Sequence, residues 1–333
     1  MPTGELLPAA GRVRTVLGDA PSIDLGRVNY HEHLFQASPL LPGDDLNDET
    51  LSGAELGRLA ESGFECMVDA TPVGLGRRPD ALARVSAASG VRVIATTGRH
   101  RDAHYPEQQW ILDASADEWA AITLRELTVG QALDDTAYGR LPLDDVATAQ
   151  APDGADVRAG MLKAAIDYWA ISRGERAALE GVAASHAATG APIMVHTESC
   201  SAALEVITLL ESYGVRPARV VIAHADRTPD PHLHAEIAAT GASVGYDGAG
   251  RLRLWPDAVL IDSLAALVES GHADRVLLGA DVARASRYES YGGMPGLAYL
   301  GRRFVPRLQQ RLGDRVVQGI LVDNPGRFLE WQN

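Results

Sequence analysis

The chain has 333 residues, of which 46% are hydrophobic, enough to form a large core and a normal length for one (β/α)8 barrel with loop insertions. Asp and Glu number 44 against 30 Lys and Arg, a formal net charge of -14. Such an acidic surface repels nucleic-acid phosphates and anionic lipid, so we expect no nucleic-acid partner and no membrane partner.

The two cysteines, Cys66 and Cys200, lie far apart and form no CxxC motif, which fits a reducing cytoplasm. The N-terminus has no long apolar run behind a basic start, so it does not resemble a signal peptide. No apolar stretch approaches the roughly 18 residues of a membrane span. We therefore expect a cytoplasmic protein.

Apolar segments and helical patterns alternate along the chain. Eight short apolar segments are predicted as strands: 27–31, 65–70, 91–96, 157–162 (the weakest), 192–196, 219–224, 242–246 and 275–279. The clearest helical patterns lie at 53–62, 79–89, 174–189, 202–213, 231–240 and 258–270. Each of these six ends at a glycine, a residue suited to a helix C-terminus.

This alternation is typical of parallel βαβ units, and eight of them predict an α/β fold, a closed (β/α)8 or TIM barrel. The alternative is an open doubly wound sheet, but no G-x-G-x-x-G follows the first strand. We assign one domain to residues 1–333, with an N-terminal extension at 1–25 and the barrel at 26–330. Residues 102–156 are predicted to form an extended loop with one helix over the active-site face.

Residues able to bind a metal gather at the predicted strand ends, where barrel enzymes place their chemistry. His31 and His33 end the first strand and share a face, because strand side chains alternate. His196, His224 and Asp281 end the fifth, sixth and eighth strands. Imidazole and carboxylate are ordinary ligands of zinc and similar ions, so this set predicts a metal site.

Glu32, between the two histidines, points away and is expected to be structural. Lys163 ends the predicted fourth strand, and an ammonium group has no lone pair for a metal. Its spacing alone favours a surface lysine or a substrate anchor.

Five motifs resemble the phosphotriesterase family of the amidohydrolase superfamily in their order: HEH, RAGMLK, PIMVHTE, IAHADR and LLGAD. The resemblance runs from about residue 26 to 328. Segments 97–105, 224–251 and 279–300 resemble the sugar-lactone branch of phosphotriesterase-like lactonases most closely.

The resemblance implies a binuclear centre with two divalent ions, which we expect to be zinc. His31, His33 and Asp281 would hold the buried ion, and His196 and His224 the exposed one. Lys163 would be carboxylated on its side-chain nitrogen, and its carbamate and a hydroxide would bridge the ions.

The implied activity is a metal-dependent hydrolase, a lactonase that opens a phosphorylated or otherwise anionic lactone by attack of the bridging hydroxide. Asp281 would be catalytic, both as a ligand and as the proton acceptor. Hydrolysis of a phosphotriester or an N-acyl amide is the alternative on the same site. A non-catalytic ligand-binding barrel is the alternative of another class, but it would be expected to lack one or more of the ligands.

Arg227, Arg251 and Arg284 follow the last three strands, where they either converge on an anionic small-molecule substrate or pair with nearby carboxylates. Tyr105 is predicted either to contact substrate or to pack. The remaining histidines, at 100, 104, 186, 232, 234 and 272, match no role in the family and are expected on the surface or in loops. A homodimer is also expected.

Overall fold

The computed structural model describes residue 9 and residues 11–332. Its centre is an eight-stranded parallel sheet in the spatial order β3 to β10. The strands are β3 Val28–Glu32, β4 Cys66–Asp69, β5 Arg92–Gly98, β6 Met161–Ala165, β7 Ile193–His196, β8 Val220–Ala223, β9 Ser243–Tyr246 and β10 Val276–Leu278. Beyond β10, Asp281 N donates to His31 O at 3.0 Å, which joins the two ends of the sheet. The predicted closed barrel is thereby confirmed.

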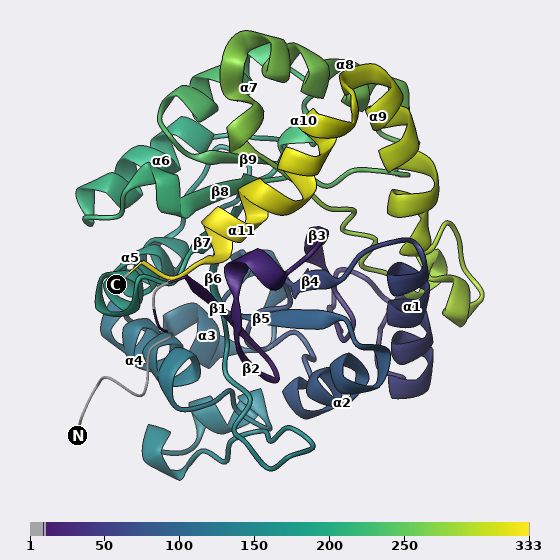
Figure 1. The fold of residues 1–333 in the computed structure, drawn as a ribbon. Coiled ribbons are helices and arrows are strands. Elements are labelled where there is room, and N and C mark those ends of the chain that lie inside the picture. Colours follow the sequence, from purple (N-terminus) through teal and green to yellow (C-terminus); the bar gives the residue numbers. More distant parts are fainter. Residues whose placement is uncertain (1–8, 10, 333) are drawn as a thin grey trace.

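Helices surround the strands, and Figure 1 shows them as a ring about the sheet. The α-helices are α1 Glu49–Glu61, α2 Pro79–Ser89, α3 Gln109–Asp113, α4 Ala116–Thr128, α5 Arg173–Thr189, α6 Ala203–Ser212, α7 Pro231–Ala239, α8 Asp257–Leu267, α9 Val305–Leu312, α10 Asp314–Gln318 and α11 Asn324–Leu329. Capping boxes at Ser115 and Ser172 begin α4 and α5, because each serine and the glutamate three residues on satisfy free backbone N–H groups. No helix of the described residues is long and apolar enough to cross a membrane.

Strand residues alternate between two cores. On β4, Cys66 and Val68 belong to the core inside the barrel, whereas Met67 belongs to the core between strands and helices. The barrel is therefore filled by side chains rather than open as a pore.

A hairpin closes the amino end of the barrel. Its strands, β1 Arg12–Thr15 and β2 Gly18–Pro21, pair antiparallel, and Val16 N donates to Val93 O near the start of β5. The C-terminal segment lies beside it, where Trp331 Nε1 donates to Gly160 O. Figure 1 shows this hairpin and α11 crossing the near end of the barrel. Ligands therefore have access from the opposite, carboxyl end.

Two expectations need correction. The fourth barrel strand begins at Met161, not at residue 157, because the backbone of 157–160 bonds mainly to the loop and helix before it, as where Ala159 N donates to Glu126 O. Lys163 thus lies in the middle of β6. The main helix of 102–156, α4, packs on α5 in the outer ring, where Thr123 contacts Ser185, and not over the active-site face.

Candidate metal centre

Strands β6 and β7 each place one inward-facing side chain near the carboxyl end of the barrel. Met161 and Met194 lie in the core inside the barrel, and Lys163 and His196, two residues further along each strand, share their face. Gly98 ends β5 against Lys163, where a Cβ would stand 1.9 Å from the Lys163 carbonyl oxygen and φ is +113°. Only glycine fits there, so β5 and β6 stay close beneath the site.

His31 and His33 come from β3 and the residue after it. The pairing of β3 with β4 is irregular here, and this local bulge lets Tyr30 and His31, though consecutive, both reach Asp247.

His224 and Asp281 follow their strands in left-handed backbone conformations, with φ of 63° and 43°. Such conformations are unfavourable for residues other than glycine and gather at functional sites. Here they carry both side chains into the centre just after β8 and β10 end.

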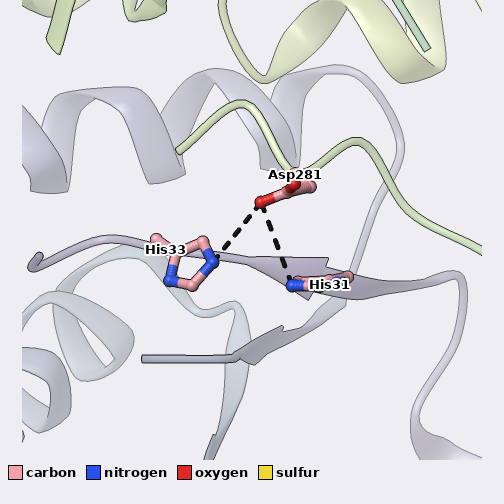
Figure 2. Close-up of side chains that lie close together, drawn as sticks. All are labelled: His31, His33 and Asp281. Carbon is pink, nitrogen blue, oxygen red and sulfur yellow. Dashed lines mark ion pairs between the residues drawn. The ribbon is translucent and has the colours of Figure 1, made fainter. Parts of the chain in front are cut away.

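The six residues predicted as ligands lie together. His33 Nε2 and His31 Nε2 stand 3.4 Å and 3.9 Å from Asp281 Oδ1, as Figure 2 shows. His224 Nε2 lies 2.8 Å from His196 Nδ1. Lys163 Nζ lies 3.5 Å from His31 Nε2 and so stands beside the first group.

The donor set fits two ions, because each histidine keeps one nitrogen for the centre and binds the protein with the other. Three of them offer Nε2, since His31 Nδ1 and His224 Nδ1 meet Asp247 at 3.0 Å and 2.7 Å, and His33 Nδ1 meets Thr71 Oγ1 at 2.8 Å. Partners of this kind fix the ring orientation and the proton position of ligating histidines.

The fourth histidine has the reverse arrangement. His196 Nε2 contacts Glu198 Oε1 at 2.7 Å, so Nδ1 is left for the centre. Glu198 also lies 3.3 Å from Arg101 Nε and 3.7 Å from Arg227 Nη1.

The ionisation states also suit cation binding. Burial lowers the pKa of His31, His33 and His196, and it lowers that of His224 to about 3, so the rings are neutral and keep a lone pair. Burial by itself would raise the pKa of Asp281, but Arg251 and the histidines hold it well below its usual range. Asp281 is therefore a carboxylate.

Lys163 is unusual because it is buried, with 1% exposure, and no carboxylate of the described residues pairs with it. Burial lowers its pKa to about 8 despite the nearby charges of Asp281 and Asp247. An unpaired buried ammonium is costly, whereas a carbamate on the same nitrogen would supply two oxygens to neighbouring cations.

A cavity of about 1000 Å³ opens over these side chains and is lined by all six of them. Arginines surround it, and the three predicted ones each have a carboxylate partner. Arg251 contacts Asp281, Arg227 Nη2 lies 3.4 Å from Asp281 Oδ2, and Arg284 Nη1 lies 3.6 Å from Asp44.

Arg287 also lines the cavity, and no carboxylate among residues 11–332 lies within ion-pair distance of it. Its pKa is lowered to about 10, first by burial and then by the positive charges of Arg251 and Arg284. Three guanidinium groups are thus crowded at one wall of the cavity, a natural site for an anion.

Tyr105 is placed elsewhere. Its side chain is fully buried, its hydroxyl donates to Val73 O at 3.0 Å and accepts from His100 N at 2.8 Å, and it does not line the cavity. Of the two roles predicted for Tyr105, substrate contact and packing, these contacts fit packing.

Of the histidines expected on the surface or in loops, His100 and His104 lie in the loop after β5, as expected, and His234 does not. His100 is buried and lines the cavity together with His104. His234 is buried on α7, where its ring contacts the Tyr246 hydroxyl at 2.7 Å. Glu32 is structural, as expected, because its carboxylate accepts from Val282 N at 3.0 Å and so holds the segment that carries Asp281.

Sequence reasoning missed Asp247, Glu198 and Arg287. Asp247 directly follows β9, and this was an available signal, because the carboxyl end of every strand faces the site. Glu198 stands two residues after His196, but nothing in the sequence shows which ring nitrogen it meets.

A closed barrel with a buried cluster of neutral histidines, a carboxylate and an unpaired lysine at its carboxyl end defines a metal-dependent hydrolase. The chain belongs to the phosphotriesterase family, whose model matches residues 11–329.

Its relatives match over nearly their whole length. A phospho-furanose lactonase of Mycoplasmopsis synoviae is 30% identical over 95% of this chain and 91% of its own. The structure of an amidohydrolase from Mycoplasma synoviae is similar, with a TM-score of 0.89 and 28% identity over 98% of this chain and 94% of that one. A lactonase from Listeria monocytogenes has a TM-score of 0.82 and 27% identity over 97% of this chain and 100% of its own.

Proposed function

We propose that the protein is a binuclear lactonase that opens anionic lactones. His31, His33 and Asp281 hold one ion, and His196 and His224 hold the second, with carboxylated Lys163 between them. The neutral imidazole nitrogens and the Asp281 oxygen that face one another support this assignment. Zinc is the metal we propose, because it suits nitrogen and carboxylate ligands. The expected single domain, homodimer and cytoplasmic location stay predictions.

Two bound ions would supply Lewis acidity, which activates water and polarises the lactone carbonyl. The protein supplies the base and its orientation. Asp281 Oδ1 faces the histidines, while Oδ2 lies towards Arg227 and Arg251. These positive charges keep Asp281 ionised, so it can accept the proton that water loses on attack and pass it to the alkoxide released when the ring opens.

The observation that carries the substrate class is Arg287. It is half-buried, has no carboxylate partner among the described residues, and lies near Arg251 and Arg284 on the cavity wall. Arg251 and Arg284 pair with carboxylates, so of these three Arg287 is the guanidinium that lacks a counter-charge, and a half-buried cation of this kind is costly unless an anion binds it. The phospho-furanose lactonase relative supports a phosphorylated lactone as that anion.

The test uses two substrates, a phosphorylated five-membered lactone and the same lactone without phosphate. Replacing Arg287 with Met keeps much of the bulk and removes the charge. A charged hydrogen bond contributes about 1.5–3 kcal/mol, so kcat/KM for the phosphorylated lactone should fall by roughly one to two orders of magnitude. The neutral lactone should change by less than about threefold, because it offers no charge to lose.

Arg302→Met is the matched control, because Arg302 pairs with Glu61 on the exterior and does not line the cavity. Equal losses on both lactones would make Arg287 structural and would overturn the anionic substrate class. Failure of the metal-loaded protein to open any lactone would overturn the proposed function itself.

A further inference from the structure

His100 and His104 are cavity residues that the proposed mechanism does not use. Both line the cavity on the side of His196. The His100 ring lies between two other imidazoles, with centroids 4.2 Å from His196 and 3.8 Å from His104. These contacts hold the His100 ring in one position beside the second ion site.

The proton of His100 is assigned by its backbone contact. Arg101 N donates to His100 Nδ1 at 2.9 Å. A backbone N–H can only donate, so Nδ1 is an acceptor without a proton. In a neutral imidazole the proton then resides on Nε2.

The other nitrogen of His100 is available to a ligand. No atom of the described residues forms a hydrogen bond with His100 Nε2, and this atom is not among the buried polar atoms that lack a partner. Since the residue lines the cavity, its Nε2–H is open to the cavity. A protonated Nε2 has no lone pair, so the same contact prevents His100 from acting as a third histidine ligand of the second ion.

We infer that His100 is a substrate-binding residue whose Nε2–H donates a hydrogen bond to an uncharged oxygen of the lactone, its ring oxygen or a hydroxyl beside it. This inference rests on the proposed lactonase function and deepens it. Arg251 and Arg287 lie near Asp281, whereas His100 lies against His196, so His100 recognises a part of the substrate that these two arginines do not. It discriminates by the presence of an oxygen acceptor and not by charge.

The His104 ring packs against the His100 ring. Its Nδ1 lies 2.8 Å from Ser38 Oγ, which ties it to the loop after β3. His104 therefore positions the His100 ring and need not itself donate a hydrogen bond to the substrate.

The first experiment identifies the proton without any turnover. Long-range 15N–1H correlation spectra of the metal-loaded protein should show one imidazole with an Nε2 proton and a bare Nδ1 that disappears in His100→Gln. A His100 signal with its proton on Nδ1, or bound to metal through Nε2, would overturn the inference. This measurement is independent of lactonase activity, so its outcome is separate from that of the proposed function.

The second experiment compares His100→Phe, which keeps a ring but has no donor, with His100→Gln, whose amide N–H2 reaches about as far as Nε2. One neutral hydrogen bond corresponds to roughly a 3- to 10-fold change. His100→Phe should lower kcat/KM and weaken binding of the ring-opened product, measured by calorimetry, by that factor. His100→Gln should restore most of both, and metal content should stay at the wild-type value in each.

The loss should be equal for the phosphorylated and unphosphorylated lactones, unlike the loss in Arg287→Met. His232→Phe, which alters an exposed histidine of α7, is the matched control and should match the wild type. Wild-type product binding in His100→Phe, or a loss of metal in that variant, would contradict a substrate-binding role.

Discussion

Asp247→Asn tests how the protein orients its ligands, because Asp247 contacts ligands of both proposed ions. Its Oδ2 accepts from the Tyr30 hydroxyl at 2.6 Å, His224 N at 3.1 Å and His31 Nδ1 at 3.0 Å, and its Oδ1 accepts from His224 Nδ1 at 2.7 Å. Four donors thus share two oxygens, whereas an amide offers one oxygen and one donor group.

In Asp247→Asn the new amide nitrogen should take the place of Oδ1 rather than Oδ2, because Oδ1 accepts one hydrogen bond whereas Oδ2 accepts three. His224 Nδ1–H then faces another donor. To relieve this contact His224 must move its proton to Nε2, the nitrogen needed for the metal, or turn away. A lost charged hydrogen bond costs about 1.5–3 kcal/mol, and loss of such an outer partner typically lowers metal affinity about 10- to 100-fold. The ion at His196 and His224 should be the weaker one.

Metal affinity is measured by competition with a chelator, together with the metal content per chain and the circular dichroism spectrum. Asp226→Asn is the matched control. Asp226 is buried beside Asp247 and accepts from Gly248 N at 2.7 Å, but it forms no hydrogen bond with a ligand histidine. Unchanged affinity for both ions in folded Asp247→Asn would refute this account of ligand orientation.

Three further outcomes are expected. Lys163→Ala should lose metal and activity together, and added short carboxylic acids should partly restore both; full metal occupancy in this variant, measured by elemental analysis, would exclude the bridging role. Asp281→Asn should lower kcat by on the order of 10²–10⁴, because it removes a ligand charge and the proton acceptor, and an unchanged kcat in steady-state assays would mean that the proton leaves by another route. Since the pKa of Lys163 is lowered to about 8, chiefly by burial, and only the neutral amine reacts with CO2, metal-free protein given zinc and the same concentration of dissolved CO2 should regain activity faster at about pH 9 than at about pH 7. A rate that falls as pH rises at constant dissolved CO2 would contradict carboxylation.

The sequence alone determined the fold and the set of candidate ligands. Apolar segments of strand length alternate with helical patterns that end at glycine, and these are local signals, so seven barrel strands could be placed and the fourth was predicted four residues too early. Strand ends then identified His31, His33, His196, His224 and Asp281, because the carboxyl ends of barrel strands meet at one face. Lys163 was assigned only through the resemblance to the phosphotriesterase family, since a lysine by itself is not a ligand.

Only the tertiary structure decided which groups meet across the barrel. Asp247 joins His31 to His224 because separate strands bring these residues together. Glu198 selects the free nitrogen of His196 through the conformation of the loop that follows β7. The same holds for Arg287, because the sequence cannot show which arginines lack a carboxylate. Nor does it show which nitrogen of His100 carries the proton, since this is set by a backbone N–H in a loop whose conformation is not periodic. Periodicity specifies elements, whereas hydrogen-bond pairing between them is a property of the folded chain.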